Sequence, residues 1–145
     1  MKHAIGIDPG QKTGVAIWNL EKNQWETILT TTPIEAQELV KLYHENGGCM
    51  VICEDARKRT YFGNSGTEKW QGAGWAKGAS KNWEDFLKYH KIPHRMQAPK
   101  NTKKDAITFR AITGWKKKTS EHARDAGMMV FKMSRSQMQM LCGLT

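Results

Sequence analysis

Residues 49–53 restrict the fold more than any other feature of the sequence. The run Cys-Met-Val-Ile-Cys is continuously apolar, and Gly47 and Gly48 precede it. Such a run is typical of a central strand that is buried on both faces of a sheet. The segment before it, residues 33–46, begins with Pro33 and repeats apolar residues at approximately helical spacing. Because a helix between two strands is the crossover of a parallel pair, the pattern predicts an α/β fold.

Three β-type segments precede this crossover, and three helical segments follow it. Residues 3–8 alternate between two faces, with Ile5 and Ile7 on one face and Asp8 on the other. The order predicted is β-β-β-α-β-α-β-α-α, which is a mixed sheet of three antiparallel strands and then parallel strands, flanked by helices, in one domain over residues 1–145. The remaining expected elements are strands at 14–18 and 25–31, a helix at 70–89, a strand at 92–97, a helix that Asn101 or Thr102 caps and that ends near residue 112, and a last helix that Ser120 caps.

The length of 145 residues excludes several classes of protein. An actin-like ATPase also begins with an Asp-x-Gly strand turn, but this chain has no room for a second nucleotide-binding lobe. We expect no membrane span, because no run of about 18 apolar residues occurs. We expect no signal peptide, because the apolar stretch at the N-terminus is too short and Asp8 interrupts it. Cys49, Cys53 and Cys142 lack metal-ligand spacing, so we expect reduced thiols in a cytoplasmic protein.

The charge balance favours a polyanionic partner. Lys and Arg total 23 against 14 acidic residues, a formal net charge of +9, which favours nucleic acid through counterion release. A basic but solvated surface is the alternative. Tyr61 and Phe62 are candidates for stacking on bases, or for packing their loop. The candidate phosphate-binding residues are Lys12, Arg57, Lys58, Arg59, Lys77, Lys81, Lys100, Lys103, Lys104 and the run 116–118. Lys12 is preferred because it lies close to Asp8 in the sequence.

Acidic residues stand at the ends of two predicted strands. Asp8 closes the first strand and Glu54 closes the central one. If these strands are neighbours, their carboxylates meet. His122 and Asp125, three residues apart, share one face of the last helix and can reach the same place. Clustered carboxylates repel unless a cation joins them, and oxygen ligands suit Mg²⁺, so the four residues predict a metal site.

Each of these residues also has a structural interpretation. Asp8 before Pro9 is typical of a turn, and Glu54 fits a cap or an ion pair with Arg57. Asp125 fits an ion pair or a solvent-facing position, and His122 fits a surface residue at a helix start. The interpretation as a metal site depends on all four residues, because one order of strands and helices along the chain would bring them to the same place.

Five stretches of the sequence resemble one family. The sequence IGIDPGQKTGVAI at residues 5–17 resembles the opening of the RuvC family of Holliday junction resolvases. VICE at 51–54 resembles that family's second acidic strand, and SEHARDA at 120–126 resembles its final helix. Residues 72–78 resemble its glycine-bearing helix, and residues 99–114 resemble its Pro…Lys…Thr-Gly stretch. The similarity spans nearly the whole chain in the same order.

The resemblance implies an RNase H-like fold and a homodimeric endonuclease that nicks branched DNA near a four-way junction. It implies one or two Mg²⁺ or Mn²⁺ ions per subunit, and a role in recombination, repair or phage DNA processing in a bacterial or phage-infected bacterial cell. Carried over by motif, Asp8, Glu54, His122 and Asp125 are the expected catalytic and metal-site residues. His122 is expected to bind the metal or to deprotonate or position the attacking water.

Two further expectations concern the partners of the chain. The helix with Gly74 and Gly78, flanked by Trp70, Trp75 and Trp83, is the candidate dimer interface or part of the core. The family's junction-probing aromatic residue lies nearer the second acid than Tyr61 or Phe62 does here, so a preference for four-way junctions over other branched DNA stays open. The competing functions are a module that binds branched nucleic acid without cutting it, and an RNase H-like nuclease for RNA-containing substrates.

Overall fold

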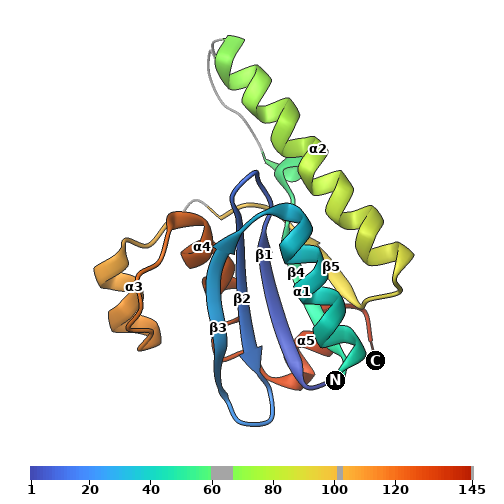
Figure 1. The fold of residues 1–145 in the computed structure, drawn as a ribbon, viewed down its shortest axis with the longest axis vertical. Coiled ribbons are helices and arrows are strands. Elements are labelled where there is room, and N and C mark those ends of the chain that lie inside the picture. Colours follow the sequence, from blue (N-terminus) through green and yellow to red (C-terminus); the bar gives the residue numbers. More distant parts are fainter. Residues whose placement is uncertain (60–66, 101–102, 145) are drawn as a thin grey trace.

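The computed structural model describes residues 1–59, 67–100 and 103–144, with the backbone alone for residues 67–73 (Figure 1). Its elements follow the expected order, with a single 3₁₀ turn and one further helix added. They are β1 (His3–Asp8), β2 (Thr13–Asn19), β3 (Gln24–Thr31), α1 (Pro33–Glu45), β4 (Cys49–Glu54), η1 (Ala56–Lys58), α2 (Thr67–Tyr89), β5 (His94–Gln97), α3 (Ala106–Thr113), α4 (Glu121–Val130) and α5 (Arg135–Leu141). Over the described ranges, none of the helices combines the length and the apolar character that crossing a membrane requires.

The sheet is mixed, as the sequence predicts. Its strand order is β3-β2-β1-β4-β5. The pairs β1–β2 and β2–β3 are antiparallel, and β1–β4 and β4–β5 are parallel. Ile7 in β1 pairs with Cys53 in β4. The carboxyl ends of these two strands therefore lie side by side, which makes Asp8 and Glu54 neighbours.

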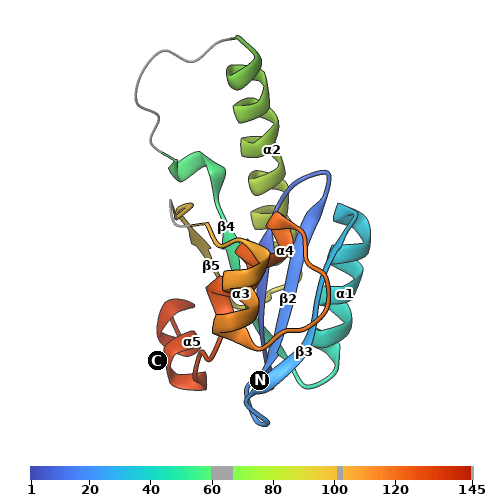
Figure 2. The same ribbon diagram turned by 90° about the vertical axis from the view of Figure 1, so that its left-hand side faces the viewer.

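Helices cover both faces of the sheet. On one face, α1 and α2 pack Val40, Trp83 and Leu87 against Ile5 and Ile7. On the other face, α3, α4 and α5 cover the sheet (Figure 2), and the buried side chains there include Ala4, Phe109, Ala126, Val130 and Met138. The alternation along β1 places Asp8 on the α4 face. Cys49, Cys53 and Cys142 are free thiols, as expected.

Two glycines let α4 lie directly on the backbone of the sheet. A Cβ atom at Gly6 would stand 2.1 Å from the carbonyl oxygen of Ala126, and one at Gly14 would stand 2.0 Å from the carbonyl oxygen of His122. No side chain fits in either place. Ser120 caps the helix as predicted, because its Oγ accepts the backbone N–H of Ala123 at 3.2 Å. The helix that carries His122 and Asp125 is therefore held at a fixed distance from β1 and β2.

Two predictions about the C-terminal third are wrong. The helix expected after Asn101 or Thr102 begins at Ala106, and its N-cap is Asp105, whose carboxylate accepts the Thr108 N–H at 2.7 Å. Aspartate caps helices as well as asparagine or threonine does, so the cap was placed too early. The helix at Ser120 is not the last, because α5 follows it with a capping box between Ser134 and Gln137.

Both ends of the chain lie toward the same end of the sheet (Figure 1). The Lys2 N–H donates to the Gly48 carbonyl at 3.1 Å, and Arg135 Nε donates to the Met1 carbonyl at 3.2 Å. This end carries the start of β1 and β4. The carboxyl ends of both strands, with Asp8 and Glu54, lie at the opposite end.

Candidate active site

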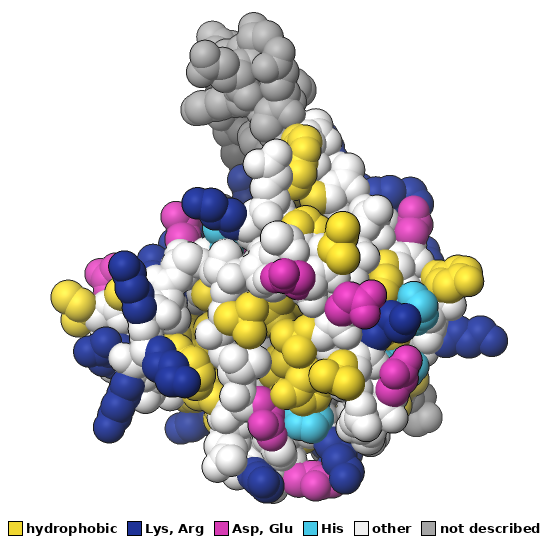
Figure 3. Space-filling view, viewed as in Figure 1, with side chains coloured by type: hydrophobic (Ala, Val, Ile, Leu, Met, Phe, Trp, Pro, Cys, Tyr) yellow, Lys and Arg dark blue, Asp and Glu magenta, His cyan; other side chains and the backbone are white. Residues whose placement is uncertain are grey.

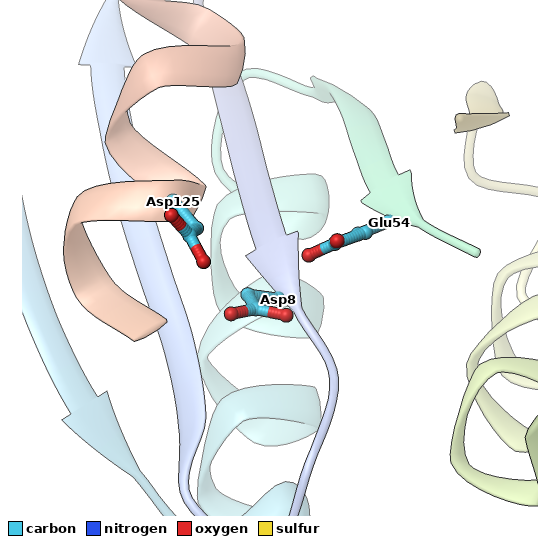
Figure 4. Close-up of side chains that lie close together, drawn as sticks. All are labelled: Asp8, Glu54 and Asp125. Atoms are coloured by element: carbon cyan, nitrogen blue, oxygen red, sulfur yellow. The ribbon is translucent and has the colours of Figure 1, made fainter. Parts of the chain in front are cut away.

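Three carboxylates meet at the carboxyl ends of β1 and β4. Asp8 comes from β1, Glu54 from β4 and Asp125 from α4, and all three side chains point into one space (Figure 4). One carboxylate oxygen from each lies within 4.8 Å of the others. The side chains of Asp8, Glu54 and Asp125 are 11%, 17% and 19% exposed. The structure thus brings together three of the four residues that the sequence singles out, in a largely buried cluster that we call the acidic cluster.

Burial and mutual repulsion change the acidity of this cluster. The pKa of Glu54 is raised to about 8. Burial is the largest cause, and the hydrogen bond with Asp8 and the charge of Asp8 act in the same direction. Burial also raises the pKa of Asp8 to about 6, although its hydrogen bond with Glu54 acts in the opposite direction. Burial raises the pKa of Asp125, which the Lys103 ammonium partly offsets. These effects favour the protonated form of Glu54, in which it can donate a hydrogen bond to the Asp8 carboxylate.

His122 touches the acidic cluster through one member only. Its Nδ1 lies 3.0 Å from Oδ2 of Asp8, and 46% of its side chain is exposed. Among the described residues, the group whose ligand atoms all converge consists of Asp8, Glu54 and Asp125. His122 is therefore placed to orient Asp8, with the rest of its ring open to solvent.

Lys103 reaches the acidic cluster from the segment before α3. Its Nζ lies 3.6 Å from Oδ2 of Asp125 and 2.5 Å from Oε1 of Glu121. No sequence signal indicates the Lys103–Glu121 contact, because the two residues are 18 positions apart, with α3 and an irregular segment between them.

The basic residues after β4 bind within the chain. Arg57 donates to Asp55 at 2.8 Å and to Glu84 at 3.2 Å, which ties η1 to α2. Lys58 donates to the Met96 carbonyl at 2.7 Å. The alternative that Glu54 pairs with Arg57 is wrong, since Asp55, the N-cap of η1, takes that partner. The nearest basic group to Glu54 in this segment is Arg59, with an N···O distance of 3.9 Å.

The other predicted DNA contacts are distributed around the molecule. Lys100 and Lys104 line a cavity whose wall includes Glu54 and Asp125. Lys12 is exposed in the β1–β2 turn, and Lys77 is exposed on α2. Tyr61, Phe62 and the side chain of Trp70 lie outside the described residues. Trp83, expected at the interface or in the core, is in the core.

No protein-family model and no curated protein sequence matches the chain. The solved structures do include similar folds. Thermus thermophilus RuvC in complex with Holliday junction substrate superposes with a TM-score of 0.56 at 18% identity, over 91% of this chain and 92% of that one. The fold is RuvC-like. A second structure of Thermus thermophilus RuvC superposes with a TM-score of 0.55 at 19% identity, over 90% of this chain and 92% of that one. The RuvC-like fold predicted from the sequence motifs is thereby confirmed.

Proposed function

We propose that the chain is a metal-dependent endonuclease that hydrolyses phosphodiesters in branched DNA, with the four-way junction as its main substrate. The observation that carries the proposal is the convergence of Asp8, Glu54 and Asp125 within 4.8 Å in a protein of net charge +9. The RuvC-like fold supports it, because one of the similar structures is a RuvC bound to Holliday junction substrate. The reaction would serve recombination, repair or phage DNA processing in the cytoplasm of a bacterial or phage-infected cell.

The donor set of the acidic cluster fits a hard divalent cation. Three carboxylates offer the oxygen ligands that Mg²⁺ and Mn²⁺ prefer. Burial is the main cause of the raised pKa values of Asp8 and Glu54, so their charged forms are costly in this place without a cation. One or two bound ions would supply an activated water and stabilise charge on the phosphodiester.

The proposed function gives each residue of the site a separate role. Asp8, Glu54 and Asp125 would hold the ions. His122 orients the Asp8 carboxylate through Nδ1, and its exposed ring is placed to act as the general base toward an attacking water. Lys100 and Lys104, which line the cavity beside the acids, bind the flanking phosphates.

Symmetric cuts on a four-way junction call for two copies of the site related by a twofold axis. Hydrophobic side chains gather in the middle of the face formed by α1 and α2 (Figure 3). A groove on this face is lined by Ile34, which is 74% exposed, and by Trp75, which is 47% exposed. Gly74 and Gly78 have no heavy atom within 4 Å of an added Cβ, so they pack against nothing within the described chain. We assign this face to the homodimer interface.

The test is a cleavage assay on a labelled four-way junction with Mg²⁺ or Mn²⁺. A linear duplex of the same sequence and an RNA–DNA hybrid serve as competing substrates. We expect the wild-type chain to cut the junction, and Asp8→Asn or Asp125→Asn to lower the rate by on the order of 10²-fold or more, since several kcal/mol of transition-state stabilisation are lost.

Asp85→Asn is the matched control, because Asp85 is an exposed residue of α2 that pairs with Lys81. It should cut at the wild-type rate. Full cleavage by the Asp8 or Asp125 variant would show that the acidic cluster is not the active site. Binding of the junction without cleavage in either metal would favour a binding module, and preferred cleavage of the hybrid would favour an RNA-directed nuclease.

A further inference from the structure

A cavity of about 250 Å³ adjoins the acidic cluster. It lies between the end of β5, the residues that follow it, and α4, and Glu54 and Asp125 form part of its wall. Pockets for drug-sized ligands span roughly 300–1,000 Å³, so this one suits a smaller group. Because two proposed metal ligands line the cavity, whatever occupies it during the reaction lies next to the bond that is cut.

Besides the two carboxylates and the two lysines, the walls of this cavity combine apolar side chains with one amide. Met128 and Met129 from α4 and Pro99 supply the apolar part, and Gln97 supplies the amide. Methionine thioethers make favourable contacts with aromatic rings. The side chain of glutamine offers both donors and an acceptor, which is the combination that base edges require.

Gln97 is placed by the same sheet that places the acids. It ends β5 and is the Cα partner of Glu54 in the parallel pair β4–β5. Its carbonyl accepts the Asp55 N–H at 2.7 Å, which fixes its backbone. Paired residues of neighbouring strands project to the same face of a sheet. The side chain of Gln97 therefore lies on the same face as those of Glu54 and Asp8, at the same end of the sheet.

We infer that this cavity, the base cavity, receives one unstacked nucleobase next to the scissile phosphate, and that Gln97 reads the edge of that base. The inference rests on the proposed function and adds a specificity-determining residue to it. Branched DNA favours such a capture, because a base that is already unpaired or loosely stacked costs little to extrude. Lys100 and Lys104, on the wall of the base cavity, hold the phosphates on either side.

The test places 2-aminopurine, which fluoresces when unstacked, at one nucleotide at a time around the cut site of a four-way junction. Binding is followed with the Asp8→Asn protein, so that the junction stays intact. We expect fluorescence to rise at one position, and the rise to disappear when Gln97→Met is added. Cleavage by Gln97→Met of a junction pool with randomised flanking bases should lose a preference of roughly 5- to 150-fold, the range of a specific amide–base contact.

Two further variants sharpen the result. Gln97→Glu keeps the shape but offers only acceptors, so it should shift the preference toward cytosine, whose amino group donates. Gln139→Met changes an exposed glutamine of α5 and should behave as wild type. Equal fluorescence at every position, or a wild-type preference in both Gln97 variants, would overturn the inference. A chain that shows the Gln97-dependent rise but cuts no junction would overturn the nuclease proposal and still support the base cavity.

Discussion

Asp8 and Glu54 bind protons more tightly in the folded chain than in an unfolded one. Their pKa values rise to about 6 and about 8, from ordinary values of 3.8 and 4.5, chiefly because both are buried. A group whose pKa is raised by folding stabilises the fold at low pH and loses that contribution as the pH rises through the folded pKa. The acidic cluster therefore opposes folding at alkaline pH until a cation binds it.

The first prediction is a loss of stability with rising pH in the metal-free protein. Between pH 5 and pH 8, Tm should fall more for the wild-type chain than for Glu54→Gln, because glutamine removes the group whose pKa is about 8. Thermal unfolding with a chelator present measures both slopes. Adding Mg²⁺ at pH 8 should raise the Tm of the wild-type chain more than that of the variant. Parallel slopes would mean that Glu54 titrates as an ordinary carboxyl group.

Lys103 already contributes positive charge at the acidic cluster, 3.6 Å from Asp125. The second prediction is that Lys103→Gln binds Mn²⁺ more tightly, by up to about fivefold, since an exposed ion pair contributes at most about 1 kcal/mol. Calorimetric titration of the metal measures this change. Lys81→Gln removes a similarly exposed lysine that pairs with Asp85 on α2, and its Mn²⁺ affinity should equal that of wild type.

At the scale of elements, the position of α4 decides the geometry of the site. The helix contacts the backbone of β1 and β2 at Gly6 and Gly14, where a side chain would overlap with the carbonyl oxygens of Ala126 and His122. Because backbone atoms contact backbone atoms here, no flexible side chain could move aside to make room. The backbone that carries Asp125 and His122 is therefore positioned by this packing.

The third prediction compares two Gly→Ala changes. Gly14→Ala should lower the free energy of unfolding by about 1–3 kcal/mol through overpacking, and should also weaken Mn²⁺ binding because α4 is displaced. Gly78→Ala, in open space on α2, should raise the free energy of unfolding by roughly 0.5–1 kcal/mol, since alanine favours a helix. Urea unfolding and metal titration measure both. A Gly14→Ala chain as stable as wild type would contradict the close packing of α4.

Local sequence patterns predicted most of the elements. The two exceptions are the start of α3 and the whole of α5. Residues 3–8 and the cap at Ser120 were predicted as the structure has them, because period-2 alternation and N-capping are local signals. The start of α3 was misplaced because several capping residues compete within 101–105. The helix α5 was missed because it has seven residues, with Met138 buried.

The candidate site was predicted in part, since three of the four residues expected there converge in the structure. The three acids follow from strand ends and one helix face. The roles of Lys103 and Gln97 do not, because they depend on contacts across the sheet end between residues far apart in sequence.

At the scale of the whole molecule, positive charge surrounds a small negative site. Under the proposed function, the net charge of +9 would attract DNA, and the acidic cluster would repel it until metal is bound. Binding should therefore depend on both the ionic strength and the metal. Lys100 and Lys104, on the wall of the cavity next to Glu54, lie where both effects act.

The fourth prediction concerns the salt dependence of junction binding. Lys104→Gln should reduce the slope of log K against log salt by about 1, the value of one phosphate contact, with little change in cut-site preference. Lys22→Gln should leave the slope unchanged, because Lys22 lies in the β2–β3 turn, at the end of the sheet away from Asp8. Fluorescence anisotropy over a range of KCl concentrations measures both slopes. An unchanged slope for Lys104→Gln would remove it from the DNA contacts.

Both chain ends lie toward the far end of the sheet, away from the carboxyl ends of β1 and β4 (Figure 1). An affinity tag or a fluorophore joined to either end would thus project away from an approaching DNA arm. Immobilisation by either terminus should leave junction binding intact, so the protein lends itself to single-molecule tethering and to fusion with a second DNA-binding module.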